Sequence, residues 1–160
     1  MSDHVRYIDK TRDYYRAEGY QTDYRWAHFD DLPFAPLDKP LRECRLGLVT
    51  TAEVAVRDAE TPENPARDVY ALPTDTPVER LYSRKASYDR YATTLEDVNA
   101  FLPLTPLRAL VAEGRLAELA PRFQVIYSNY SQRRSMEIDA PEVLHQCRED
   151  GVDAVLLAAV

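Results

Sequence analysis

The chain has 160 residues, of which 45% are hydrophobic and 29% charged, a composition typical of one soluble globular domain with a buried core. Its formal net charge of −7 argues against non-specific nucleic-acid binding, which requires a basic surface. No stretch reaches the apolar length of a membrane span, and the N-terminus lacks the apolar tract of a signal peptide, so no membrane partner is expected.

The first predicted element is a helix over residues 3–18, which Gly19 ends. Five tyrosines fall in or near it, at positions 7, 14, 15, 20 and 24. They could stack on a ligand or partner, although the pattern favours rings that pack the helix onto the domain. Three prolines then make residues 30–40 an extended connector. We therefore divide the chain into residues 1–40, helix and connector, and residues 41–160, an α/β domain.

The α/β domain begins with a buried strand over residues 44–51, followed by a surface loop over residues 57–68. A short strand is predicted at residues 69–72, before a turn through residues 73–77. The next helix is expected to have Thr105 as its N-cap, with Pro106 in the first turn, and to end at Gly114.

Three further elements follow in the C-terminal third. Residues 115–120 are predicted as a short helical turn and residues 124–129 as a strand. A final helix over residues 139–150 is expected to turn Val143, Leu144 and Cys147 inward. Gly151 then leads into an apolar run to residue 160, which is typical of a parallel strand covered on both faces.

This alternation predicts a doubly wound α/β fold with a mainly parallel sheet. Right-handed crossovers would bring the carboxyl ends of the strands to one edge, where such folds bind ligands. Thr50, Thr51, Ser128 and Asn129 would lie at that edge, where hydroxyl and amide groups can donate hydrogen bonds to an anion or carboxylate. Alternatively, these side chains only cap the turns that follow the strands.

Two other polar segments are candidates for the site. Arg25 and His28, beside Asp30 and Asp31, could bind a small acid or relay protons, although a structural clamp is favoured. A second segment, formed by Ser87, Tyr88 and Asp89, is either a polar loop that reaches the sheet edge or a solvated turn; the sequence leaves both open.

Several catalytic and cofactor motifs are absent from the sequence. The four glycines are widely separated, which excludes the dinucleotide fingerprint and the nucleotide-triphosphate loop. The three histidines have no metal-ligand spacing with the two cysteines, and there is no G-x-S-x-G elbow, so we expect no metal or cofactor in this chain. Cys44 and Cys147 fit reduced thiols in the cytoplasm, and neither has the surroundings of a redox nucleophile.

An ordered set of segments resembles the N-terminal part of the glycine/sarcosine/betaine reductase selenoprotein B family. These segments are residues 24–34, 36–41, 45–52, 72–77, 87–89, 104–114 and 149–157. The resemblance implies an α/β fold, a small amino-acid or betaine-like substrate, partner subunits or a homo-oligomer, and a thioredoxin-like electron donor.

The family's redox residue, a selenocysteine or cysteine, is expected just after the strand that matches residues 154–160, and thus beyond Val160. A selenocysteine codon interpreted as a stop would end translation at this point, which we take as one hypothesis; it predicts an exposed apolar face on the last strand and a tendency to self-associate. The alternative is a non-catalytic module that binds a small acid or a partner subunit.

Overall fold

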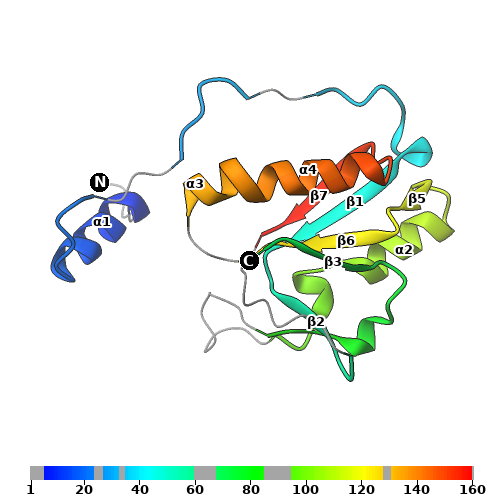
Figure 1. Cartoon of the computed structure of the whole chain (residues 1–160), viewed down its shortest axis with the longest axis horizontal. Helices are drawn as coiled ribbons and strands as arrows, with labels where there is room; N and C mark the ends of the chain where they lie inside the picture. The colour runs from blue at the N-terminus through cyan, green and yellow to red at the C-terminus, as the bar shows by residue number, and fades with distance from the viewer. Residues whose placement is uncertain are drawn as a thin grey trace, which may run out of the picture. The chain divides into compact units, whose positions relative to one another are not determined.

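The protein is described by a computed structural model, which covers residues 6–23, 27–32, 35–59, 68–84, 95–127 and 131–159. The chain divides into two compact units, Met1–Phe34 and Ala35–Val160. The first contains helix α1 (Tyr7–Ala17), which gives way to a turn with Gly19 at φ 90°, the left-handed conformation that glycine adopts readily (Figure 1).

Helix α1 is stabilised locally. Its Arg16 guanidinium donates to both carboxylate oxygens of Asp23, at 2.8 and 2.7 Å. The rings of Tyr14 and Tyr15 pack edge to face, with their centroids 5.7 Å apart. The rings of Tyr15 and Tyr20 pack in the same way, with their centroids 5.4 Å apart. No residue of α1 is buried, so the tyrosines contact one another while remaining accessible to solvent.

The second unit is organised around strand β1 (Arg45–Thr50). Along one edge, β1 pairs in parallel with β5 (Glu118–Leu119) and β6 (Arg122–Val125), and β6 pairs antiparallel with β3 (Tyr70–Pro73). Along the other edge, β1 pairs in parallel with β7 (Ala154–Ala158). The sheet is therefore mixed but mainly parallel, which confirms the predicted fold class.

Hydrogen bonds show that the two edges of β1 are distinct. The carbonyls of Leu46 and Thr50 accept from Ala120 and Ile126 on the β5–β6 side, whereas the amide of Thr51 donates to Ala158 on the β7 side. Because successive residues of a strand point their backbone groups to opposite edges, this even–odd alternation places β7 opposite β5 and β6.

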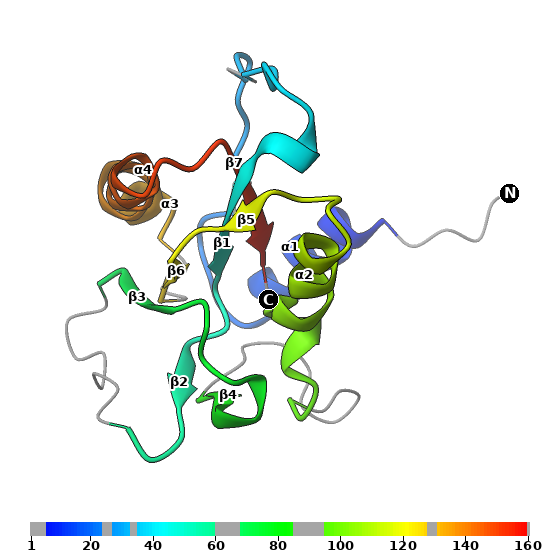
Figure 2. The ribbon, with the colours of Figure 1, turned by 90° about the vertical axis from the view of Figure 1, so that its right-hand side faces the viewer.

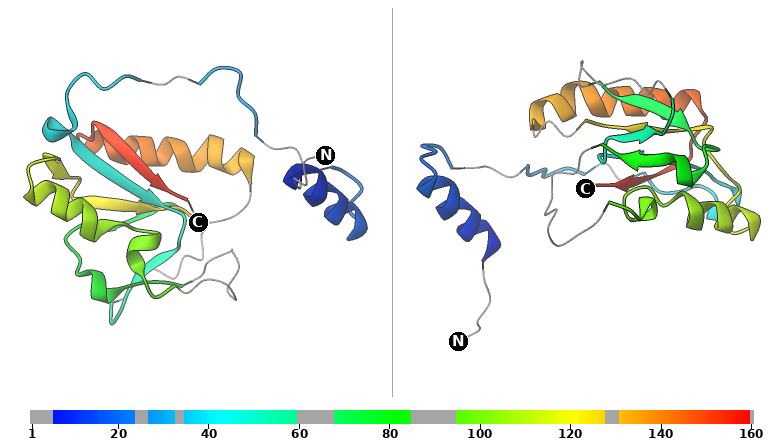
Figure 3. Two further views of the ribbon diagram at one scale, coloured as in Figure 1. Left: turned by 180° about the vertical axis from the view of Figure 1, so that it is seen from behind. Right: turned by 90° about the horizontal axis from the view of Figure 1, so that it is seen from below.

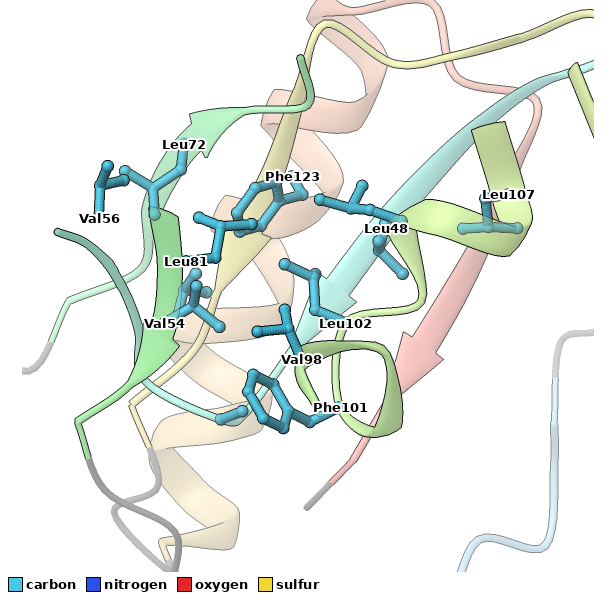
Figure 4. Close-up of a cluster of buried hydrophobic side chains, with 13 residues drawn as sticks. Leu48, Val54, Val56, Leu72, Leu81, Val98, Phe101, Leu102, Leu107 and Phe123 are labelled. Atoms are coloured by element: carbon cyan, nitrogen blue, oxygen red, sulfur yellow. The ribbon is translucent and has the colours of Figure 1, made fainter. Parts of the chain in front are cut away.

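Helices cover both faces of the sheet. Helix α2 (Leu104–Ala112) lies on one face and α4 (Ala140–Glu149) on the other, as Figure 2 shows. The larger core lies on the α2 face, where Leu48 and Phe123 from the sheet pack with Phe101, Leu102 and Leu107 (Figure 4). On the α4 face, Val49 packs with Val143 and Cys147.

Several short elements complete the unit. Strands β2 (Val54–Val56) and β4 (Leu81–Ser83) form an antiparallel pair that was not predicted. Their side chains Val54, Val56 and Leu81 are buried in the larger core, which explains why such short strands are stable. The remaining helical turns are Leu41–Glu43, Val78–Arg80, Val98–Ala100, α3 (Gln132–Arg134) and a π-helical segment (Ser135–Asp139).

The predicted helical turn over residues 115–120 is wrong. Glu118 and Leu119 form strand β5, because the amides of Glu118 and Ala120 donate to the carbonyls of Cys44 and Leu46 in β1. Pairing with the central strand thus outweighs the local helical preference of this segment.

Two details of the predicted helices also need correction. Thr105 lies inside α2 and is not its N-cap; its amide donates to Asn99 Oδ1 at 3.0 Å. In α4 the inward residues are Val143, Gln146 and Cys147, whereas Leu144 is 49% exposed. Gln146 and Cys147 follow Val143 by three and four residues and share its face, whereas Leu144 is one residue from Val143 and is rotated away from that face by about 100°.

Candidate functional site

The carboxyl ends of β1, β6 and β7 lie together at one end of the sheet, as the sequence predicts (Figure 1). We call this end of the sheet the carboxyl edge. There the Ile126 amide donates to the Thr50 carbonyl at 2.9 Å, and the Thr51 amide donates to the Ala158 carbonyl at 3.3 Å. In open α/β folds this carboxyl edge is where ligands bind, so we take it as the candidate site.

Thr50 is completely buried at this edge. Its hydroxyl donates to the Phe101 carbonyl at 2.8 Å and accepts from the Ala52 amide at 3.2 Å. Both hydrogen bonds connect the end of β1 to neighbouring backbone, so the Thr50 hydroxyl has a structural role at the carboxyl edge.

Thr51, the next residue, is only partly buried. It directly follows β1 and lies within reach of solvent, and its amide donates to the Ala158 carbonyl. His28 lies in the N-terminal unit, where its side chain is exposed and its Nε2 is 3.2 Å from Asp30 Oδ1. The other predicted site residues lie outside the described residues: Arg25, Ser87, Tyr88, Asp89, Ser128 and Asn129.

The connection that leaves β1 has an unusual backbone. Glu53 adopts φ 48°, a conformation that residues other than glycine rarely take. It is held on both sides, because the Arg84 amide donates to the Glu53 carbonyl at 3.2 Å and the Ser83 hydroxyl donates to the Ala52 carbonyl. Backbone strain of this kind concentrates at functional sites, and here it follows the strand end directly.

Tyr70 supports the same connection from β3. Its hydroxyl donates to the Val54 carbonyl at 2.7 Å, and burial raises its pKa well above the ordinary value. Tyr70 therefore stays protonated as a structural donor at neutral pH.

A charged network lies at the start of the helical segment on the α4 face. The Asp139 carboxylate is only 2% exposed and lies 3.3 Å from Arg134 Nε, while Arg134 Nη2 is 3.2 Å from Asp68 Oδ1. Sequence reasoning missed this network because the five-residue spacing of Arg134 and Asp139 matches no ordinary helical pair; the π-helical turn over Ser135–Asp139 brings them together.

A cavity of about 530 Å³ adjoins this network, lined by Asp68, Val69, Glu137, Ile138, Pro141 and Glu142. The cavity lies where β3 and α4 begin. Because β3 is antiparallel to β6, the start of β3 lies beside the end of β6, so this cavity is at the carboxyl edge. A second cavity of about 500 Å³ lies at the opposite edge, where β3 ends and β6 begins. The switch-point rule favours the first cavity as part of the candidate site.

Neither cysteine has the properties of a redox nucleophile. Cys44 and Cys147 are both buried and form no disulfide. Burial raises the pKa of the Cys147 thiol, and the Cys44 thiol donates to the Pro40 carbonyl at 3.5 Å. A reactive thiol requires an accessible sulfur, so redox chemistry is not expected from these two buried residues.

The described part of the chain has neither a metal-ligand group nor a membrane-spanning helix. Across the described ranges, no group of three histidine, cysteine or acidic side chains is arranged to hold a metal ion. In the same part of the chain, no helix combines the length and the apolar character that crossing a membrane requires.

Comparisons with known proteins agree on one family. The family model described as glycine/sarcosine/betaine reductase selenoprotein B matches residues 5–160. The chain is 33% identical over 129 residues to D-proline reductase subunit gamma of Acetoanaerobium sticklandii, covering 79% of this chain and 52% of that protein. It is 26% identical over 160 residues to sarcosine reductase complex component B subunit beta of Peptoclostridium acidaminophilum, covering 96% of this chain and 36% of that protein.

The chain thus spans about half of the first relative's length and about a third of the second's. No solved structure matches it.

Proposed function

We propose that this chain, which belongs to the glycine/sarcosine/betaine reductase selenoprotein B family, is a subunit of a reductase complex that acts on a small amino acid or betaine-like substrate. The observation that carries the proposal is the family match over residues 5–160, together with two relatives whose names are those of reductase subunits. The sheet supports it by gathering three strand ends at the edge where α/β folds bind ligands.

The proposed reaction is the reductive cleavage of a carbon–nitrogen bond. Two electrons and two protons are consumed: the carbon gains a hydrogen, the nitrogen leaves as a protonated amine, and a thiol pair or a thiol–selenol pair is oxidised. Cys44 and Cys147 are buried and do not suit this role. We therefore assign the selenol or thiol to polypeptide outside these 160 residues, with a thioredoxin-like donor that reduces it again in the cytoplasm.

Within the chain, we assign substrate binding to the carboxyl edge. We assign to Thr51, together with Ser128 and Asn129, hydrogen bonds to the substrate carboxylate, and to Thr50 the fixing of the end of β1. The burial of Thr50 and the partial accessibility of Thr51 support this division of roles.

Purification of the tagged chain with its bound proteins tests the proposal. Glycine, sarcosine, betaine and D-proline are each supplied with dithiothreitol as reductant, and products are followed by mass spectrometry. We expect one of them to be cleaved by the complex and not by the 160-residue chain alone. A complex that binds a substrate but cleaves none of the four would support the non-catalytic module instead.

The variant Thr51→Val provides the residue-level test, because it removes the hydroxyl and keeps the shape of the side chain. Loss of one hydrogen bond to a charged group should raise KM about tenfold at nearly constant kcat.

The double variant Cys44→Ala/Cys147→Ala should leave kcat unchanged. A loss of turnover in that variant, with folding intact, would place the redox centre inside this chain and contradict the proposal.

A further inference from the structure

Strand β7 lies at the margin of the sheet, although its sequence is that of an interior strand. Its residues Ala154–Ala158 include no charge, proline or glycine, the features by which natural edge strands avoid unwanted pairing. The side chains of Val155, Leu156 and Leu157 are 41%, 39% and 69% exposed. Figure 3 (left) shows β7, in red, beside β1 in front of the other strands.

The register of β7 defines which of its backbone groups face outward. The Ala158 carbonyl accepts from Thr51 in β1, so even-numbered residues of β7 point their backbone groups toward β1. Val155 and Leu157 consequently point their amides and carbonyls to the other edge. Among the described residues, no strand pairs with that edge.

The side chains of β7 extend both faces of the core. Leu156 is in register with Leu48, which belongs to the core on the α2 face. Leu157 is in register with Val49, which packs against α4 on the opposite face. Any occupant of this edge must therefore offer apolar side chains on both of its faces, as well as backbone hydrogen bonds.

We propose that the occupant is β7 of a second copy of this chain, paired antiparallel about a two-fold axis through Leu156. In this register Leu156 lies opposite Leu156 of the other copy, Val155 opposite Leu157, and Ala154 opposite Ala158. The order Ala-Val-Leu-Leu-Ala nearly reads the same in both directions, so large residues meet large ones and small residues meet small ones.

The hydrogen-bond pattern fits the same register. Val155 and Leu157 both point their backbone groups outward and lie opposite each other, so each pair exchanges two hydrogen bonds across the axis. Leu156 points its backbone groups back to β1 and forms the non-hydrogen-bonded pair between them. Any shift by one residue would place inward-pointing groups of one copy opposite outward-pointing groups of the other and lose these bonds.

The charges around β7 permit this approach. The Asp153 carboxylate, just before the strand, is 2.7 Å from Lys39 Nζ and accepts from the Arg45 amide at 2.8 Å, so its charge is balanced within its own copy. The two copies together would form one continuous sheet in which β7 becomes an interior strand, as its sequence pattern indicates. The inference rests on β7 alone and is independent of the proposed reaction.

Disulfide trapping tests the occupant and the register together. In an antiparallel pair, non-hydrogen-bonded neighbours approach closely enough for a disulfide, so Leu156→Cys should give a covalent dimer under mild oxidation. Leu144→Cys on α4 is the matched control, since that leucine is at least as exposed as Leu156, 49% against 39%, but lies away from the proposed axis. The native cysteines are buried in both variants.

Analytical ultracentrifugation of the unmodified chain and of Leu157→Glu gives the second test. The unmodified chain should be a dimer at micromolar concentration, and the charged variant should raise the dissociation constant by about tenfold or more. Because Leu157 is largely exposed, this variant should keep the unfolding transition of the monomer. A monomeric unmodified chain, or a dimer that Leu156→Cys does not trap, would overturn the inference.

Discussion

Adjacent residues at the end of β1 serve different purposes. The Thr50 hydroxyl is committed to two backbone groups, whereas Thr51 is partly accessible and contributes its amide to β7. Both are threonines after the same apolar strand, so sequence alone assigns them the same role. Burial, which depends on the neighbouring Phe101 segment, is what separates them.

Thr50→Val should lower the free energy of unfolding by about 1–3 kcal/mol, because it leaves the Phe101 carbonyl and the Ala52 amide without their buried partner. Urea denaturation measures the change. Thr105→Val, at an exposed position of α2, is the control and should change stability by less than about 0.5 kcal/mol. Equal effects of the two substitutions would contradict the structural role of the Thr50 hydroxyl.

Gln124 is a buried amide in β6 whose side-chain nitrogen and oxygen have no hydrogen-bond partner among the described residues. Gln124→Met keeps the length of the side chain and removes this unsatisfied pair, so it should raise the free energy of unfolding by about 1–2 kcal/mol. Gln146→Met is the matched control: it also removes a buried oxygen without a partner but loses the hydrogen bond that Gln146 donates to Glu142 at 2.7 Å, so it should gain less than about 0.5 kcal/mol. A destabilised Gln124→Met would show that the amide binds a partner in solution.

The ion pair between Lys39 and Asp153 gives a prediction about pH. A hydrogen bond from Lys39, and then the Arg45 amide, lower the pKa of Asp153 below its ordinary value of 3.8. A carboxyl group whose pKa is lower in the folded state stabilises the fold above the unfolded pKa and loses that effect as pH falls through the folded pKa. Lys39→Met should therefore raise the pKa of Asp153, as measured by NMR titration, and reduce the loss of stability below about pH 4. An unchanged titration would exclude the pair in solution.

Among the helices and strands, the sequence predicts those whose formation depends on a single segment of the chain. The strands over residues 44–51 and 151–160 and the final helix are found near their expected places, because each has its own apolar pattern and Gly151 separates the helix from the last strand. Elements that depend on distant partners are missed: β5 forms only through β1, and β2 and β4 form only through each other. The same holds for the site, where the strand ends are predicted but the Arg134–Asp139 pair is not.

Gly47 is required for the close packing of β1 against the entry to β7. A Cβ atom there would lie 3.1 Å from Val152 Cγ1 and 3.5 Å from Val155 Cγ2. Gly47→Ala should therefore lower the free energy of unfolding by about 1 kcal/mol or more. Adding Val152→Ala should relieve the clash, so that the double-mutant cycle gives a favourable coupling of at least about 0.5 kcal/mol. Strict additivity of the two substitutions would rule out this contact.

At the scale of the whole molecule, the chain consists of two units with different sources of stability. The unit Ala35–Val160 has a buried core on both faces of its sheet, whereas α1 in the unit Met1–Phe34 buries no residue. A helix of this length is marginal in water by itself.

Removal of residues 1–34 should leave the unfolding midpoint of the remaining chain within about 2 °C of the full-length value, because none of the residues in α1 is buried. Thermal unfolding followed by circular dichroism measures this. Full-length protein and the shortened chain should show one cooperative transition each. A large drop in the midpoint would show that the first unit stabilises the second.

The pairing of β1 with β7 also has a consequence for biosynthesis. Arg45, the first residue of β1, contacts Asp153, which directly precedes β7, and 108 positions separate the two in the chain. At ordinary elongation rates of about 5–20 residues per second, the ribosome takes roughly 5–20 seconds to add that length. Throughout this interval one edge of the nascent central strand has no partner, so chaperones that recognise apolar nascent segments should find their binding site in β1.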